Sequence, residues 1–204
     1  MKRTILIVLA LFSIIGIAYA QWSVKSVQSD LEKTYGDLNS ISFDFENLID
    51  GQSGSILAVR GNMYIMKFMD FEVTCNGETV WNYNSQENRV LIGDFDEDDS
   101  QNSLERMFFS FMNDYKVESV SKINSSDGRS ELEILLSPVV DNEDMNDFYI
   151  WCDANNYHLR KMEVVDGPIA GEWVISNLKL NKKVSEKLFD YQAPDSAKVI
   201  DLRD

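Results

Sequence analysis

The sequence contains a single histidine, His158, so any catalyst that depends on an imidazole has only one candidate. The G-x-S-x-G motif of serine hydrolases is absent, and a papain-like cysteine would need His158 as its partner. His158 follows a turn at the start of an expected strand, and no nucleophile can be assigned to it. We therefore predict that the chain is not an enzyme. A secreted hydrolase that uses two carboxylates stays open as an alternative, although no pair of acids stands out.

Signatures of bound cofactors and metals are also missing. No glycine-rich loop could cradle a phosphate, and the two cysteines do not make a zinc site. Cys75 and Cys152 can form a disulfide in an oxidising compartment, but the sequence does not determine how close they lie. Bonded and free cysteines both remain open, and we expect no cofactor.

A short acidic loop is the remaining candidate for a metal site. Asp94, Asp96 and Asp98 match positions 1, 3 and 5 of an EF-hand loop, and Glu105 falls at position 12. Position 6, where the sharp turn needs glycine, is Asp99. The residues before the loop are typical of a strand and not of a helix. We therefore expect a solvated loop without a metal ion.

Basic side chains are scarce, with 19 lysines and arginines against 34 acids. If the first twenty residues are removed, 17 basic side chains remain and the net charge becomes −17. Such a charge repels phosphate backbones and anionic membrane surfaces. Nucleic acid is therefore excluded as a partner, and we expect a monomer.

Long apolar runs are absent except at the start of the chain. Lys2 and Arg3 precede an apolar run over residues 5–17, and Ala18-Tyr19-Ala20 follows it. This pattern is typical of a secretory signal peptide with an A-x-A cleavage site, and the run is shorter than the roughly 20 residues of a membrane span. We predict a signal peptide over residues 1–20, cleaved after Ala20, and export to the periplasm. Gln21 would follow the cut, so no lipid-anchoring cysteine is expected there.

Hydrophobic periodicity predicts two helices and roughly ten or eleven strands. Apolar residues spaced by three and four predict amphipathic helices over residues 22–39 and 103–114. Turn signals such as Asn76-Gly77 separate the strands, which are expected over residues 41–45, 56–60, 63–68, 71–75, 79–83, 89–92, 117–123, 130–136, 147–152, 157–165 and 172–180. Hairpin-length links favour antiparallel pairing. We predict a mainly β (α+β) fold, a barrel or strongly curved sheet, in one domain over residues 21–204.

The second helix suggests that the molecule contains more than a packed core. It carries Met107, Phe108, Phe111 and Met112, which are bulky side chains that repack easily around apolar ligands. A curved sheet closed by two such helices can leave an apolar cavity. The alternative is that these side chains simply fill a core, and the residues by themselves favour that alternative.

Four short motifs occur in order along residues 22–203. The first is Ile41-Ser42-Phe43-Asp44-Phe45, and the second is the strand and turn over residues 54–64. The third is the hairpin over residues 74–83, close to D-G-x-x-x-W-x-Y but with Asn76 in place of aspartate. The last pairs Leu188-Phe189-Asp190-Tyr191 with Val199-Ile200-Asp201-Leu202-Arg203. Together these motifs resemble the LolA family of periplasmic outer-membrane lipoprotein carriers.

The resemblance implies an incomplete β-barrel whose helices form a lid over an apolar cavity. It also implies a periplasmic chaperone that takes acylated lipoproteins from an inner-membrane ABC transporter and hands them to an outer-membrane acceptor. Arg60 stands where the family has an arginine that hydrogen-bonds to the lid and holds it closed. Gly61 follows it, where the family usually has proline. A related lipid-binding carrier or envelope sensor with another ligand is the alternative.

Candidates for the cavity wall are chosen by apolar character and by predicted element. They are Ile56, Met63, Ile65, Trp81, Tyr83, Ile92, Met107, Phe108, Phe111, Met112, Trp151, Met162 and Trp173.

Overall fold

The computed structural model describes residues 22–96, 104–124, 128–140, 145–166 and 170–203. The predicted signal peptide lies outside these residues, as do Asp98, Asp99 and the side chain of Glu105 from the acidic loop. In the described chain, twelve strands form one sheet in the order β12-β6-β5-β4-β3-β2-β1-β11-β10-β9-β8-β7. Neighbouring strands are antiparallel except β6 and β12, which run parallel.

The element bounds follow the predicted periodicity closely. The helices are α1 (Val24–Tyr35), α2 (Leu104–Phe109), α3 (Phe111–Asp114) and the 3-10 helix η2 (Glu186–Phe189). The strands are β1 (Ser40–Asn47), β2 (Ser53–Val59), β3 (Met63–Phe68), β4 (Phe71–Asn76), β5 (Thr79–Asn84), β6 (Arg89–Asp94), β7 (Tyr115–Asn124), β8 (Ser130–Pro138), β9 (Phe148–Asp153), β10 (Leu159–Val164), β11 (Gly171–Leu180) and β12 (Lys198–Asp201).

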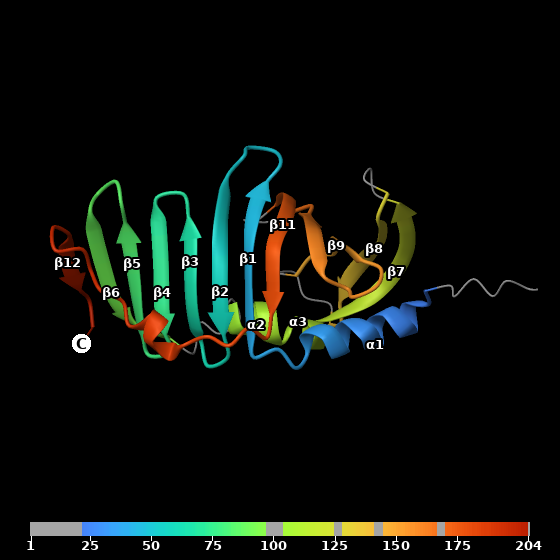
Figure 1. The fold of residues 1–204 in the computed structure, drawn as a ribbon, viewed down its shortest axis with the longest axis horizontal. Helices are drawn as coiled ribbons and strands as arrows, with labels where there is room; N and C mark the ends of the chain where they lie inside the picture. The colour runs from blue at the N-terminus through green and yellow to red at the C-terminus, as the bar shows by residue number, and fades with distance from the viewer. Residues whose placement is uncertain (1–21, 97–103, 125–127, 141–144, 167–169, 204) are drawn as a thin grey trace, which may run out of the picture.

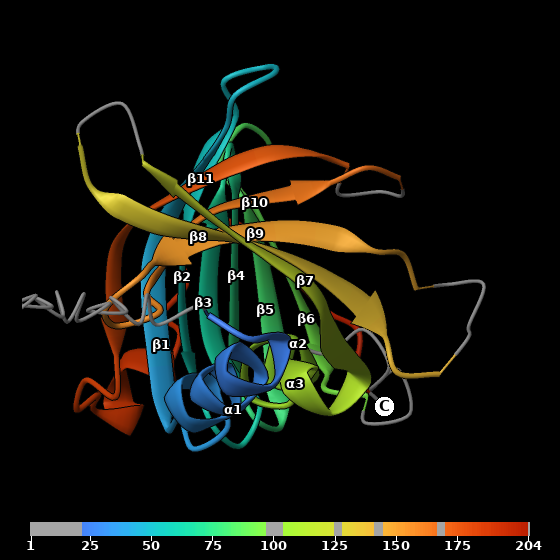
Figure 2. The ribbon, with the colours of Figure 1, turned by 90° about the vertical axis from the view of Figure 1, so that its right-hand side faces the viewer.

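The sheet is strongly curved and does not close. Figure 1 shows the strands side by side from β12 to β7, with α1, α2 and α3 at the lower end of the molecule. Seen from the side in Figure 2, strands β7 to β10 cross in front of strands β1 to β6. The two edge strands, β12 and β7, are not paired with each other. The predicted mainly β, strongly curved antiparallel sheet is therefore confirmed.

Helix α1 begins at a capping box and ends earlier than predicted. The Ser23 side chain accepts from the Ser26 backbone N–H at 3.1 Å, and the Ser26 side chain accepts from the Ser23 backbone in return. Val27, Leu31 and Tyr35 are buried at a spacing of four, so one stripe of the helix packs on the sheet. The helix stops before Gly36, which is a poor residue for continuing a helix.

The second predicted helix is broken into two. Ser110 separates α2 from α3 and has φ −135° and ψ 2°, which are not helical values. With this break, the ring of Phe108 meets Phe43 of β1 at 5.6 Å, and the ring of Phe111 meets Tyr35 of α1 at 5.7 Å. The periodicity over residues 103–114 did not predict the break, because both short helices keep the same apolar spacing.

The C-terminal segment, residues 181–203, was not predicted to have regular structure. It crosses one face of the sheet and ends as β12 beside β6, as Figure 1 shows. On the way, η2 lies against β3 and β4 and buries Phe189 to 1% exposure. The ring of Tyr191 stacks on Trp81 at 6.1 Å. We call the face covered by this segment the outer face, and the face toward α2 and α3 the inner face.

In the described part of the chain, no helix has both the length and the apolar character that a membrane span requires.

Candidate functional site

An apolar cavity of about 400 Å³ lies between the inner face of the sheet and the three α-helices. Seventeen residues line it, and every one is aromatic or aliphatic. They are Tyr35, Ile41, Phe43, Phe45, Ile56, Met66, Phe68, Met107, Phe108, Phe111, Phe148, Ile150, Leu159, Met162, Trp173, Ile175 and Leu178. A pocket of this size and composition suits an apolar ligand and offers no set of charged groups for chemistry.

Six of the predicted residues lie in the wall of this cavity. They are Ile56, Met107, Phe108, Phe111, Met162 and Trp173. Their contact with a bound ligand stays a prediction. Met107 is 47% exposed, so it lies where the cavity meets solvent.

Five other predicted residues face the opposite way, and their assignment to the cavity is corrected here. They lie on strands β3 to β6 with their side chains on the outer face: Met63, Ile65, Trp81, Tyr83 and Ile92. Side chains alternate along a strand. Ile56 and Met66, which pair with each other across β2 and β3, point inward, so Ile65 next to Met66 points outward. These strands are apolar on both faces because the C-terminal segment covers part of the outer one. The sequence pattern alone does not distinguish the two faces.

Met112 and Trp151 are also outside the cavity wall. Met112 is buried to 8% exposure in the core beneath α3. Trp151 follows the cavity residue Ile150 on β9 and therefore faces outward. Its indole N–H donates to Glu133 Oε2 at 3.1 Å, and the ammonium of Lys161 lies 3.6 Å from its ring centroid. Trp151 is thus held by charged side chains on the outer face of the sheet.

Eleven residues of the wall were not among the predicted ones, and most of them lie on central strands. Ile41, Phe43 and Phe45 of β1 show the clearest missed signal, because they alternate with polar residues and point to one face. The remaining eight are Tyr35, Met66, Phe68, Phe148, Ile150, Leu159, Ile175 and Leu178. The alternation at β1 identifies a buried face, but not that this face lines a space.

Aromatic rings form one end of the cavity wall. Phe45, Gly54 and Phe68 occupy one rung of β1, β2 and β3. The ring of Phe45 stacks on Phe68 at 5.9 Å across β2 and meets Trp173 edge-on at 5.7 Å. A side chain at Gly54 would collide with the ring of Phe45 and with the backbone oxygen of Lys67. Glycine at this position therefore allows the two rings to meet.

Tyr35 ties α1 to the hairpin between β9 and β10. Its hydroxyl donates to the Tyr157 carbonyl at 2.9 Å and accepts from the Leu159 N–H at 3.0 Å. Burial raises the pKa of Tyr35 well above its usual range. The Tyr157 hydroxyl donates to Asp30 on the same helix at 2.8 Å. These bonds connect α1 directly to the sheet that forms the cavity wall.

Arg60, the predicted lid-holding residue, lies between α1 and α2. Its Nε donates to the Leu38 carbonyl at 2.6 Å, and Nη2 donates to the Gly36 carbonyl at 2.9 Å. Its guanidinium lies 5.2 Å from the ring centroid of Phe109 on α2. One side chain from the β2–β3 turn thus contacts both the end of α1 and the helix over the cavity.

Cys75 and Cys152 are free and buried. Five strands separate β4 from β9 in the sheet order, so the predicted alternative of a disulfide is wrong for this structure. Burial is the main cause that raises the pKa of both thiols, and the pKa of Cys152 reaches about 12.

We expect both thiols to resist alkylation while the protein is folded, because the thiolate is the reactive form. With iodoacetamide at pH 8, labelling of the folded protein should be at least ~100-fold slower than labelling in urea. Mass spectrometry would count the modified thiols over time. A Ser121→Cys variant places a thiol at an exposed position on β7 and serves as the reactive control. Labelling of Cys75 or Cys152 at the control's rate would contradict their burial.

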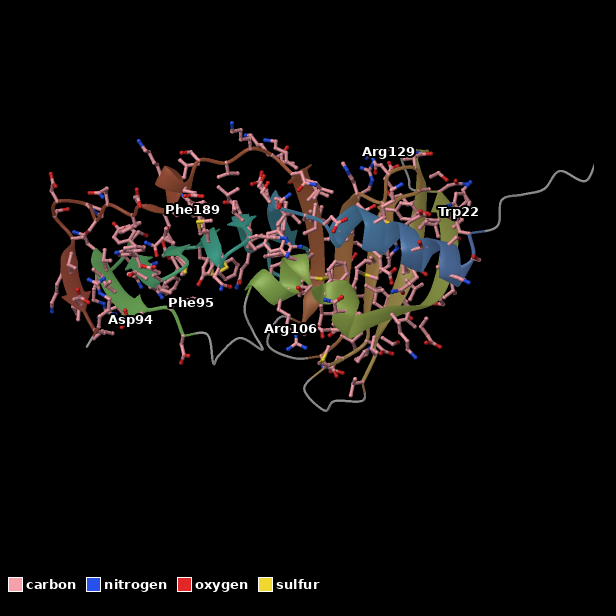
Figure 3. The ribbon with its side chains drawn as sticks, turned by 90° about the horizontal axis from the view of Figure 1, so that it is seen from below. Trp22, Asp94, Phe95, Arg106, Arg129 and Phe189 are labelled. Carbon is pink, nitrogen blue, oxygen red and sulfur yellow. The ribbon has the colours of Figure 1, made fainter. Side chains whose placement is uncertain are left out.

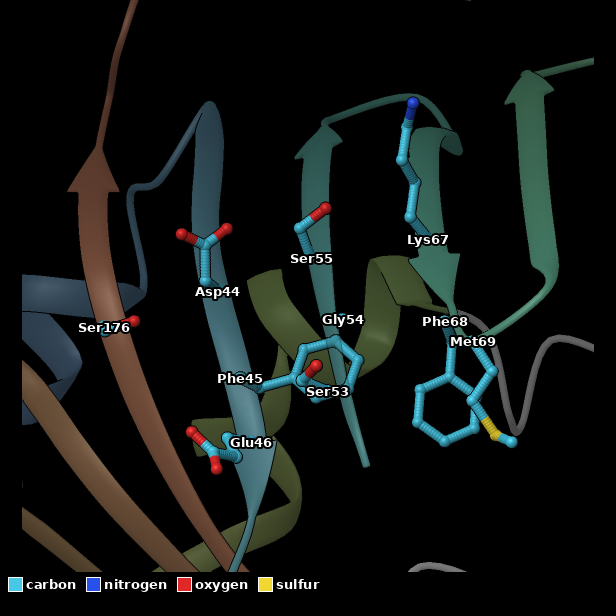
Figure 4. Close-up of a pocket in the computed structure, with 10 residues that line it drawn as sticks. All are labelled: Asp44, Phe45, Glu46, Ser53, Gly54, Ser55, Lys67, Phe68, Met69 and Ser176. Atoms are coloured by element: carbon cyan, nitrogen blue, oxygen red, sulfur yellow. The ribbon is translucent and has the colours of Figure 1, made fainter. Parts of the chain in front are cut away.

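Two further features bear on the choice of site. A hollow of about 420 Å³ is lined mainly by charged and hydroxyl side chains, and Figure 4 shows Asp44, Ser55 and Lys67 there on three neighbouring strands. It lacks the continuous apolar wall of the cavity. Among the described residues, no group of three or more histidine, cysteine or acidic side chains could hold a metal ion. The apolar cavity is therefore the candidate site.

A curved, unclosed sheet with an apolar cavity under short helices places this molecule among folds that can enclose an apolar ligand. A family model described as "Outer membrane lipoprotein carrier protein LolA" matches residues 37–192, and the chain belongs to this LolA family. The resemblance found from the four motifs is thereby confirmed.

Individual relatives are distant in sequence. An outer-membrane lipoprotein carrier protein of Francisella tularensis subsp. novicida is 24% identical over 213 residues, which cover 98% of each chain. An uncharacterized conserved protein from Thermus thermophilus shares the fold with a TM-score of 0.54 at 12% identity, over 88% of this chain and 99% of that one. A LolA superfamily protein from Nitrosomonas europaea has a TM-score of 0.37 at 12% identity, over 84% and 100% of the two chains.

Proposed function

We propose that this protein is a periplasmic chaperone that binds the acyl chains of lipoproteins and carries them from the inner to the outer membrane. The observation that carries the proposal is the cavity of about 400 Å³ with its wholly apolar wall. Membership of the LolA family supports it, and carriers of this family are not enzymes. The proposed mature protein is one domain over residues 21–204, released from its signal peptide after Ala20.

The physical need for such a carrier follows from the hydrophobic effect. Each methylene removed from water contributes about 0.8 kcal/mol, so an acyl chain cannot leave a membrane unshielded. The wall includes Met66, Met107 and Met162, whose flexible side chains adapt to chains of different shape. A repackable wall binds acyl chains without a rigid fit, and a carrier must also release what it binds.

A carrier of this kind needs a donor, a recipient and a residue that positions the helices over its cavity. The donor is an inner-membrane ABC transporter that releases lipoproteins, and the recipient is an outer-membrane acceptor. Arg60 holds the helices over the cavity through its bonds to Gly36 and Leu38 and its contact with Phe109. Breaking these contacts would let α2 move away from the end of α1.

Dye displacement tests the proposal. The purified chain from Gln21 onward is loaded with an environment-sensitive apolar dye and titrated with a triacylated lipopeptide or its unacylated twin. We expect displacement by the acylated peptide alone, with a dissociation constant in the micromolar range or below. A micromolar constant corresponds to a binding free energy of about −8 kcal/mol.

Three outcomes separate the alternatives. Failure of the dye to bind, or an equal response to both peptides, would contradict acyl-chain recognition. If a free fatty acid displaces the dye as effectively as the lipopeptide does, a carrier or sensor with another lipid ligand would be favoured. Loss of binding when the cavity wall is changed would locate the ligand in the cavity.

A further inference from the structure

The two short helices over the cavity are attached to the sheet in different ways. Helix α3 runs without a gap into β7, and the carbonyl of Asp114 at its end accepts from the Val139 N–H at 2.8 Å. The ring of Phe111 also rests on Tyr35, which is itself bonded to the β9–β10 hairpin. Helix α3 is therefore continuous with the framework of the cavity.

Helix α2 is joined to α3 through Ser110, whose backbone has left the helical region. Its contacts with the sheet are made by aromatic side chains, Phe108 on Phe43 and Phe109 beneath Arg60. Ring contacts of this kind can slide and re-form without leaving a polar group unpaired. The non-helical residue between two helical segments is the place where a rotation needs the fewest broken hydrogen bonds.

A bidentate ion pair bridges this break. Arg106 Nε lies 2.6 Å from Asp114 Oδ2, and Arg106 Nη2 lies 2.7 Å from Oδ1. Figure 3 shows Arg106 beside the two short helices. The residues are eight apart in sequence, so in one continuous helix they would be about 12 Å apart along its axis. The pair therefore forms only while the chain is bent at Ser110, and it favours the bent, closed arrangement.

We propose that α2 alone swings about Ser110 when the cavity opens, and that Arg106 and Asp114 are positioning residues that set how often it does so. This inference rests on the proposed function, because opening matters only if a ligand enters. Neither residue lines the cavity, so the pair controls access and not the apolar contacts with the ligand. Helix α1, held by Tyr35 and Tyr157, stays in place.

Two variants, each of which removes one charge of the Arg106–Asp114 pair, test the proposed hinge. In Arg106→Gln and in Asp114→Asn, the dissociation rate of the apolar dye should rise about fivefold, the effect of losing one partly exposed bidentate pair. Hydrogen exchange at residues 107–110 should accelerate by a similar factor, whereas exchange in α1 and β1 should not change. The double variant should match either single one, because both remove the same interaction. Lys67→Gln, which breaks the exposed Lys67–Glu72 pair on the outer face, is the matched control.

Specific results would overturn the inference. Unchanged exchange at residues 107–110 in both variants would show that the pair does not hold α2. Equal acceleration in α1 and α2 would show that the helices open together and that Ser110 is not the hinge. If the wild-type protein does not take up dye, the proposed function fails, while the exchange measurement still decides the hinge by itself.

Discussion

Replacement of both Phe108 and Phe111 by aspartate is expected to abolish acyl-chain binding, with a loss of affinity of at least ~100-fold. The two rings belong to the part of the cavity wall that the helices contribute, and they contact Phe43 and Tyr35. Two carboxylates there would either be buried without partners or draw water into the cavity, and both cost several kcal/mol. The dye and lipopeptide titration measures the effect.

The controls for this variant separate lost binding from lost folding. Ile49→Asp with Leu188→Asp introduces the same two charges at positions that are 77% and 57% exposed and outside the cavity wall. This control should bind like the wild type. Circular dichroism should show the sheet intact in both double variants. Unchanged lipopeptide affinity in the Phe108 and Phe111 variant would mean that the ligand binds elsewhere.

Phe189→Ala is expected to lower the free energy of unfolding strongly, because Phe189 is among the largest fully buried side chains of the described residues. Phe189, the last residue of η2, is 1% exposed, and truncation of a buried phenylalanine costs about 3–5 kcal/mol. The change weakens the attachment of the C-terminal segment to β3 and β4. Because these contacts lie on the outer face, lipopeptide affinity of the folded protein should stay within about twofold of the wild type. Urea denaturation and the dye titration measure the two quantities.

The neighbouring residue provides a matched control. Leu188 is 57% exposed, so Leu188→Ala should change the free energy of unfolding by less than about 0.5 kcal/mol. A loss of affinity in folded Phe189→Ala would show that the outer face is coupled to the cavity. A small loss of stability in that variant would contradict the packing described for η2.

Local pattern predicted most elements because each depends on neighbours in sequence. The alternation of Ile41, Phe43 and Phe45 predicted β1, and the Asn76-Gly77 turn, with Gly77 at φ 96°, predicted the β4–β5 hairpin. The stripe of Val27, Leu31 and Tyr35 predicted α1. These signals also explain why the mainly β, curved sheet was predictable, since short links between strands favour antiparallel neighbours.

The candidate site was predicted only in part. Residues on the helices over the cavity, such as Phe108 and Phe111, were found because they belong to an unusually bulky apolar stripe. Residues on the strands were divided between the two faces, because Ile65 and Met66 are equally apolar but point in opposite directions. Choosing between them requires knowing that the C-terminal segment packs on one face.

The sequence by itself determined the type and order of most elements, the excess of acidic charge and the resemblance to the LolA family. Only the tertiary structure decided which face of the sheet lines the cavity, where the helix breaks at Ser110, and that Cys75 and Cys152 are separate. The physical reason is the range of the interactions. Helix and strand periods are set by neighbouring residues, whereas faces, breaks and pairings are set by segments such as residues 181–203 that reach the sheet from far along the chain.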